Sequence, residues 1–359
     1  MGKLTVSYNN NSIIDTTNDG SFTLATEGKL MADDVSVTFE GGVPLTLEVN
    51  VDTGSAVTVT NGTTTLTGTS ENGKCTFTLP EAGAWTASAV RNGESSTTKT
   101  YNIESPYIVN LVFVKSTFND NDWSDIRVVS DLGVGSDYWS IGDRKAVVLN
   151  GTVGSYTFSN LTTYAFIIGF NHNSDYEGGN SIHFQFGKTA RSGGKDICFA
   201  AFHMNNSSTS SGGWESSDMR NTICGTSLSS YSGTFIAALP SDLRSVLKTV
   251  TKYTDNTGGG SPQASAVTAT TDVIFLLAEW EVFGKSGYAN SAEKDYQAQY
   301  AYYAAGNSKV KYKHSKTSEA LSWWLRSPSS NYFGCVSSGG NTDSSDPTYS
   351  YGFAPAFCV

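Results

Sequence analysis

Residues 323–359 read WWLRSPSSNYFGCVSSGGNTDSSDPTYSYGFAPAFCV, and two apolar segments in this stretch enclose a long polar one. Trp323 to Leu325 at one end and Phe353 to Phe357 at the other have the composition of buried strands. Between Ser327 and Tyr351, 20 of 25 residues are Ser, Asn, Asp, Thr, Tyr or Gly, so few residues there can form a core. We expect a polar surface held at both ends by buried strands.

The composition of the polar segment is typical of surfaces that bind other molecules. Tyr supplies a large, rigid contact area, and Ser, Gly and Asn supply adaptable hydrogen bonds. An ordinary surface loop is the alternative, since loops use the same small polar residues, but this run is long for a loop of a compact domain. We therefore predict a ligand-binding surface made of Ser329, Ser330, Asn331, Tyr332, Phe333, Ser337, Ser338, Asn341, Thr342, Asp343, Ser345, Asp346, Tyr349 and Tyr351.

The same stretch resembles a known family. Trp323–Pro328 followed by Gly352–Val359 is similar to the C-terminal signature of an uncharacterised domain family of gut Gram-positive bacteria and their phages, related to formylglycine-generating-enzyme-like C-type lectin folds. Five upstream segments fit in order: 123–126, 139–143, 212–220, 239–243 and 272–284. The resemblance implies a C-type-lectin-like ligand-binding domain over 117–359 with a variable region at 323–359. Some members are diversified by retroelements that substitute at Asn-type codons, and most residues of 329–351 are reachable in that way.

The preceding residues indicate two further modules. Residues 1–42 contain short alternating strands, and the Gly-Lys-x-Met-x-x-Asp-Val motif at 28–35 resembles the N-terminal attachment module of phage tail and fibre proteins. Gly41-Gly42 is expected to be a hinge. Residues 43–116 alternate in polarity between Asn-Gly turns, which favours a small β-sandwich; it resembles an immunoglobulin-like spacer. The predicted fold class is mainly β with an α+β head.

Within residues 117–359 the patterns predict a few regular elements. Leu243, Val246, Leu247 and Val250 share one helical face, so a helix is expected over 239–250. A second helix is expected over 291–303, where Tyr296, Tyr300 and Tyr303 recur at helical spacing. A flexible loop is expected over 254–265 and a buried strand over 273–282.

Composition excludes several classes of function. The formal net charge of −10 and the pI of about 4.9 argue against a nucleic-acid partner. No apolar run approaches the length of a membrane span, so membrane insertion is not expected, and the N-terminus does not have the pattern of a secretion signal. The five cysteines have no paired spacing, which favours reduced thiols made in a cytoplasm.

No constellation of residues points to catalysis, a metal or a cofactor. The four histidines are far apart and lack metal-ligand spacing. Cys335 and Cys358 lie in the region where formylglycine-generating enzymes hold paired cysteines, but the copper-binding arrangement of that family is missing. The acidic clusters 119–122 and 343–346 fit either calcium ligands or turns. Arg326 and Trp214 are expected to have structural roles.

These observations lead to the expectation of a phage tail-tip receptor-binding protein, made in the bacterial cytoplasm and carried on the virion. The partners expected are a host-cell surface protein or glycan, other tail proteins through the N-terminal module, and further copies of the chain, with a homotrimer implied by the resemblance. Two alternatives remain: a bacterial cell-surface adhesin with the same head, and an oxidase of the formylglycine-generating type.

Overall fold

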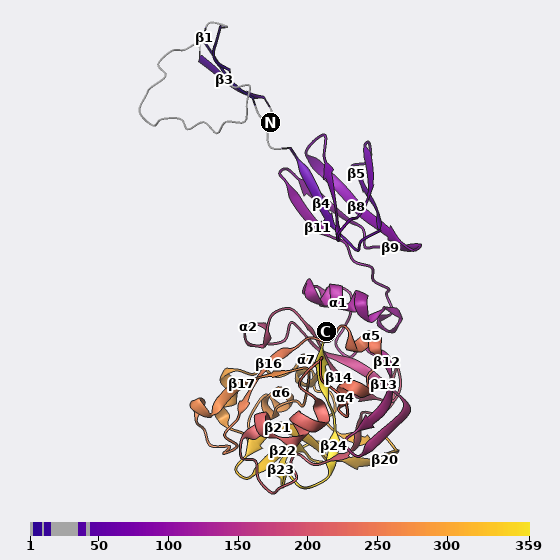
Figure 1. Cartoon of the computed structure of the whole chain (residues 1–359), viewed down its shortest axis with the longest axis vertical. Coiled ribbons are helices and arrows are strands. Elements are labelled where there is room, and N and C mark those ends of the chain that lie inside the picture. Colours follow the sequence, from indigo (N-terminus) through magenta and orange to yellow (C-terminus); the bar gives the residue numbers. More distant parts are fainter. Residues whose placement is uncertain (1–2, 9–10, 16–34, 41–43) are drawn as a thin grey trace. The chain divides into compact units, whose positions relative to one another are not determined.

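The computed structural model describes residues 3–8, 11–15, 35–40 and 44–359 of the chain. The chain is mainly β and divides into two compact units, Met1–Phe113 and Val114–Val359 (Figure 1). Most of the sequence motif at 28–35 and the Gly41-Gly42 hinge lie outside the described residues.

The described residues of the first unit form three sheets, two of them antiparallel and one mixed. One sheet has the strand order β2-β1-β3, the second has β10-β8-β5-β6 with β9 paired to β8, and the third has β11-β4-β7. The strands are β1 Lys3–Tyr8, β2 Asn11–Asp15, β3 Val35–Glu40, β4 Thr46–Asn50, β5 Ala56–Thr60, β6 Thr65–Thr69, β7 Lys74–Thr78, β8 Gly83–Arg91, β9 Glu94–Ser95, β10 Lys99–Ile103 and β11 Tyr107–Asn110.

Residues 44–113 form the sandwich that their alternation predicts. Leu47 and Val49 of β4 and Val57 and Val59 of β5 belong to one buried cluster, so the two sheets share a core. Trp85 of β8 is also part of this cluster. The turns between strands adopt the left-handed backbone that Asn-Gly pairs favour. Asn72 and Gly73 both have positive φ, and so do Asn92 and Gly93.

The second unit is built on two large sheets and one hairpin. The strand orders are β12-β13-β14-β25-β18 and β20-β19-β15-β24-β21-β22-β23, and β16 pairs with β17. The strands are β12 Arg144–Val153, β13 Tyr156–Phe170, β14 Ile182–Lys188, β15 Ile197–Phe202, β16 Val250–Asp255, β17 Val267–Asp272, β18 Ile274–Phe275, β19 Lys311–Lys313, β20 Lys316–Leu321, β21 Trp323–Ser329, β22 Tyr332–Val336, β23 Thr342–Ser345, β24 Tyr351–Phe353 and β25 Ala356–Cys358.

Helices in this unit are short. The α-helices are α1 Trp123–Asp131, α2 Ser174–Glu177, α3 Gly213–Ser216, α4 Phe235–Ala238, α5 Ser241–Arg244, α6 Glu279–Phe283 and α7 Ala301–Ala304. A π-helical turn covers Met219–Cys224, and 3-10 turns cover Phe118–Asp120, Gly135–Asp137, Ala264–Ala266 and Ser291–Asp295.

The helix predicted over 239–250 is wrong beyond its first turn. Only Ser241–Arg244 is helical, and Val250 begins β16. Val246 and Leu247 are buried after a turn that ends the helix, and the neighbouring Lys248 N–H donates to the Cys358 carbonyl at 2.9 Å. Tertiary pairing with the C-terminal strand therefore replaces the helical hydrogen bonds that the apolar spacing suggested.

Instead of the single helix predicted over 291–303, the chain forms a 3-10 turn at Ser291–Asp295 and the one-turn helix α7 at Ala301–Ala304. The Tyr296 ring stacks on Tyr253 with centroids 4.6 Å apart, and the Tyr300 N–H donates to the Glu281 carbonyl at 2.9 Å. Each tyrosine thus serves a different tertiary contact, so helical spacing between them carried no structural meaning.

The strand predicted over 273–282 is confirmed only at Ile274–Phe275. Residues 273–278 are all fully buried, as expected. The chain then turns into α6 at Glu279, where the Glu281 carboxylate accepts the Ala278 N–H at 2.8 Å and so caps the helix.

The apolar frame of the C-terminal segment is confirmed. Trp323, Trp324, Leu325, Phe353 and Phe357 are all fully buried. β21 pairs with β22 and, in parallel, with β24, whereas β25 lies between β14 and β18 in the other large sheet. Residues 351–358 therefore pass from one sheet to the other and join the two halves of the unit.

Trp324→Ala should lower the free energy of unfolding by roughly 3–5 kcal/mol, because it removes a fully buried indole from the core. It also leaves the Phe202 carbonyl without its 2.8 Å hydrogen bond from Nε1. Chemical denaturation of the full chain measures the change. Tyr349→Ala is the matched control: this side chain is 56% exposed, so we expect a change within about 0.5 kcal/mol. Equal midpoints for the two variants would show that Trp324 is not part of the stabilising core.

Candidate ligand-binding surface

The composition of the polar segment suggested one long loop, but the segment contains strands. It forms two hairpins, β21–β22 and β22–β23, followed by a loop at 346–350. Ser330 has a φ of 55°, so the turn between β21 and β22 uses the left-handed region. Phe333, Gly334, Cys335 and Val336 of β22 are all buried, so this part of the segment is a core strand and not an exposed loop.

Most of the predicted binding residues are accessible. Tyr332 is 45% exposed and Tyr349 is 56% exposed. The other exposed members are Ser330, Asn331, Ser338, Asn341 and Asp343, and the half-buried ones are Ser337, Thr342, Ser345, Asp346 and Tyr351. Two predicted members are corrected: Phe333 is fully buried and Ser329 is only 8% exposed, because both side chains are directed into the interior.

The structure brings only part of the predicted set together. The Ser345 hydroxyl lies 3.1 Å from the Tyr351 hydroxyl, and the rings of Tyr349 and Tyr351 are 6.3 Å apart. The Tyr351 ring also packs on buried Trp324, with centroids 4.8 Å apart. Asn331 and Asn341, in contrast, lie in turns at opposite ends of β22. We call Ser345, Tyr349 and Tyr351 the tyrosine cluster.

A loop that the sequence analysis did not single out adjoins the tyrosine cluster. The Met204 N–H donates to the Pro347 carbonyl at 2.9 Å, and Ser208 donates to the Asp346 carboxylate. The Ser210 hydroxyl is 2.5 Å from the Ser330 carbonyl. Residues 205–211 read NNSSTSS, so the composition that marked 327–351 also marks this loop. The same signal was present and was not used.

The glycine-rich segment 254–265, which was expected to be a flexible loop, packs against the β21–β22 turn. The Asp255 carboxylate accepts N–H groups from Thr257, Gly258 and Gly260 at 3.0 to 3.2 Å. Gly260 has a φ of 65°, and a Cβ there would meet the Ser330 nitrogen at 2.5 Å. Glycine is therefore required for the close approach of this segment to the β21–β22 turn.

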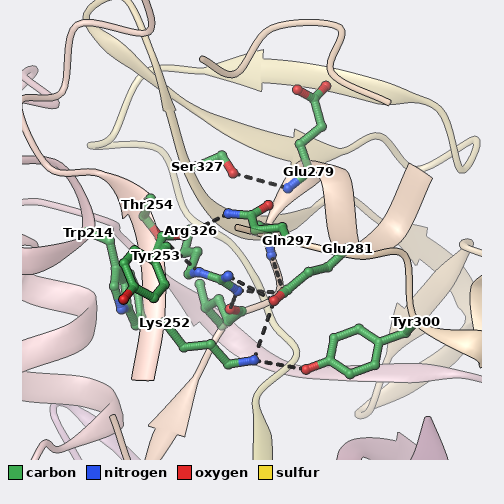
Figure 2. A network of polar contacts seen from close by, with 12 residues as sticks. Trp214, Lys252, Tyr253, Thr254, Glu279, Glu281, Gln297, Tyr300, Arg326 and Ser327 are labelled. Atoms are coloured by element: carbon green, nitrogen blue, oxygen red, sulfur yellow. Dashed lines mark hydrogen bonds and ion pairs between the residues drawn. The ribbon is translucent and has the colours of Figure 1, made fainter. Parts of the chain in front are cut away.

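A buried ionic network lies beneath the strands, and Figure 2 shows Arg326 and Lys252 directed at the same carboxylate, that of Glu281. Arg326 donates to both Glu281 oxygens at 2.5 and 2.8 Å, and also to the Leu276 carbonyl at 2.8 Å. Lys252 lies 3.4 Å from Glu281 and 3.0 Å from the Tyr300 hydroxyl, and it pairs with Glu177. The expected structural role of Arg326 is confirmed.

Burial and charge act in opposite directions on the acids of this network. Burial favours the neutral form of Glu281, but Arg326 and Lys252 hold the pKa of this carboxyl well below its usual value. Burial raises the pKa of Glu177 to about 6 despite the ion pair with Lys252. Burial also raises the pKa of Glu293 to about 7. The Arg326–Glu281 ion pair, with Lys252 beside it, thus forms the centre of the network.

One group of residues in the network has ligand atoms spaced for a metal ion. Atoms of His172, Glu177 and Glu281 lie within 4.8 Å of one another. Burial lowers the pKa of His172 to about 3, so its imidazole is neutral, and its Nε2 atom has no hydrogen-bond partner. The Lys252 ammonium bonds both carboxylates, however, and supplies the positive charge that a metal would bring. We therefore interpret the group as part of the ionic network.

The cysteines discussed for oxidase chemistry are buried and belong to different sheets. Cys335 is 1% exposed in β22, and Cys358 is fully buried in β25, where its Sγ atom lies 3.2 Å from His183 Nδ1. Burial raises the pKa of Cys335 to about 12 and also raises that of Cys358. All five cysteines are free thiols. Neither thiol is therefore set up as a nucleophile.

Comparison with known proteins gives a match to a family model over part of the chain. Residues 195–359 match the family described as "Domain of unknown function (DUF6273)", so the C-terminal part of the chain is similar to that family. The match includes the tyrosine cluster, the 203–211 loop and most of the ionic network. No curated protein and no solved structure matches the chain. Within the described part of the chain, no helix has the length and apolarity to cross a membrane.

Glu293 should make the protein less stable as the pH rises from 5 to 8. Its folded-state pKa of about 7 lies above the ordinary 4.5, so the stability it contributes is present at low pH and lost as pH rises through 7. We expect this group to lower the free energy of unfolding by roughly 1–3 kcal/mol over that window, as measured by denaturant titration at each pH.

Glu293→Gln provides the control, because the amide is neutral throughout this range. Its stability should fall less steeply between pH 5 and 8 than that of the natural chain, with the remaining slope coming from groups such as Glu177, whose pKa is about 6. An identical slope in both proteins would contradict the assignment of a raised pKa to Glu293.

Proposed function

We propose that this chain is a receptor-binding protein of a phage tail tip, and that the surface around the tyrosine cluster binds a molecule on the host cell. The observation that carries the proposal is the exposure of Tyr332 at the start of β22 and of Tyr349 in the loop before β24, beside the fully buried strand β21. No described group in this surface has the geometry for catalysis, whereas tyrosines among small polar residues favour recognition.

Rigidity of the support favours binding. A surface that is already ordered loses little conformational entropy on association, so more of the contact energy appears as affinity. Tyr351 is held by Trp324 and Ser345, and the 346–350 loop is held by hydrogen bonds to residues 203–208. Binding at such a surface therefore does not require the loops to fold first.

Diversification by a retroelement fits the same surface. Exposed positions such as Asn331, Asn341 and Asp343 have side chains outside the core, so substitutions there should leave the fold intact. The ligand could thus change while the scaffold is kept. We propose that the N-terminal module attaches to other tail proteins, that the sandwich is a spacer, and that three copies assemble, so that avidity raises a weak affinity per site.

Tyr349→Ala and Tyr351→Ala should each weaken binding of the purified full chain to host cells by about tenfold or more, because aromatic residues dominate binding hot spots. The measurement is saturation binding of fluorescently labelled protein to a panel of gut Gram-positive strains. Tyr107→Ala is the matched control, since this tyrosine is 45% exposed but lies on β11 of the other unit. The proposal fails if both head variants fold and bind as tightly as the control.

Chelators and thiol-blocking reagents should leave that binding within a few fold of its untreated value. The Asp346 carboxylate accepts hydrogen bonds from Ser208 and Thr348, which indicates a turn stabilised by its own side chain. Cys335 is 1% exposed and cannot be reached by a reagent in the folded state. The check is the same cell-binding assay with EDTA or N-ethylmaleimide. Loss of binding with EDTA, restored by calcium, would instead make residues 343–346 a calcium site.

A further inference from the structure

A second concave site lies in the 114–359 unit, and none of its lining residues belongs to the variable region. The cavity has a volume of about 530 Å³ and is lined by residues 116–119, 141–144, 188 and 191–193 together with Tyr302 and Asn307. These segments are the chain leading into β12, the end of β14 with the loop after it, and helix α7 with the turn that follows. The volume falls in the range of small-molecule sites.

The cavity is lined by three cationic side chains, and two of them have no acidic partner. Arg144 Nη1 donates to the carbonyls of Ala190 and Gly193 at 2.8 and 2.6 Å. Among the described residues, no carboxylate forms an ion pair with Arg144 or with exposed Arg191. Arg144 is therefore fixed in direction through one nitrogen, while its remaining N–H groups are free to donate to a ligand.

The lining of the cavity also contains one lysine, Lys188, whose charge is paired. Lys188 is 5% exposed, donates to the Tyr302 hydroxyl at 2.5 Å and pairs with Asp196. Lys311 is 1% exposed, its Nζ atom has no hydrogen-bond partner, and it lies 5.5 Å from the Phe166 ring that Lys188 also approaches. Lys188 is thus balanced by Asp196, and burial lowers the pKa of Lys311 to about 8, so the unpaired positive charge at the cavity lies on Arg144 and Arg191.

We propose that this cavity binds an acidic sugar, with the anionic group on Arg144 and Arg191 and the hydroxyl groups on the neutral side chains around them. A fixed guanidinium with free N–H groups recognises a planar or tetrahedral anion through charge-assisted hydrogen bonds. Ser116, Thr117, Asn119 and Asn307 supply donors and acceptors of the kind that sugar hydroxyls use. Asp143 lies in the same lining, so a ligand with both an anion and hydroxyl donors fits better than a simple anion.

The site is independent of the proposed receptor-binding surface, and the chain as a whole carries a formal net charge of −10. A cluster of uncompensated cations on such a protein attracts an anion locally while the rest of the surface repels it. Binding of an anion would therefore depend on the local charges of this cavity and not on the net charge of the protein. Sugars that carry a carboxylate and sugars that carry a phosphate both combine an anionic group with hydroxyl groups.

The experiment is isothermal titration of the full chain at low ionic strength with three probes: D-glucuronate, glucose 6-phosphate and neutral glucose. We expect millimolar binding of at least one acidic probe, about tenfold or more tighter than glucose, and weakened by added salt. The stronger of the two acidic probes identifies the anion. If neither acidic probe binds more tightly than glucose, the proposal is overturned.

Variants test the location. Arg144→Gln and Arg191→Ala should each weaken the acidic probe severalfold, and Arg191 is exposed, so its removal does not disturb folding. Lys285→Ala removes one exposed positive charge elsewhere in the same unit and should leave the affinity unchanged. Tyr349→Ala should also leave it unchanged, which separates this site from the receptor-binding surface. Equal affinities for Arg191→Ala, Lys285→Ala and the natural chain would refute the site.

Discussion

The bidentate ion pair between Arg326 and Glu281 is the contact on which the arrangement of the second unit depends. Both side chains are fully buried. Removing either partner would leave an unpaired charge in the core, which typically costs about 3–5 kcal/mol. The pair connects β21 to α6, and the further bonds of Arg326 reach Thr254 on β16 and the Leu276 carbonyl after β18. Three segments distant in sequence, around residues 254, 276–281 and 326, are thereby fixed around one guanidinium.

From this pair, a chain of hydrogen bonds leads outward to the polar surface. Next to Arg326, the Ser327 hydroxyl donates to Glu293 at 2.7 Å and accepts the Glu279 N–H at 3.1 Å. The Glu279 carboxylate in turn accepts a hydrogen bond from Thr342 on the edge strand β23 and from the Ala289 N–H at 2.8 Å. The outermost strand of the sheet is therefore connected to the buried charges through two side chains. This connection gives the exposed residues a rigid base.

Sequence patterns predicted the parts of this arrangement that are local. The Trp323–Leu325 and Phe353–Phe357 segments are buried, as their large apolar side chains predict. The Asn-Gly turns of the sandwich form where they were expected. The partner of Arg326 could not be predicted, since Glu281 is 45 residues away and nothing in its neighbourhood distinguishes it from other glutamates. The two predicted helices failed for the same reason: their apolar residues are buried through long-range contacts, which periodicity alone does not reveal.

The division of the second unit into two sheets gives the two proposed sites different supports. The tyrosine cluster lies on β23, β24 and the loop between them, in the seven-stranded sheet, whereas the cationic cavity is bordered by β12 and β14 of the five-stranded sheet. Residues 351–358 join the sheets through main-chain pairing and fully buried side chains such as Phe353 and Phe357. Substitutions at exposed positions of 330–350 do not alter these joining contacts. A surface that changes its ligand can therefore coexist with a cavity whose lining stays constant.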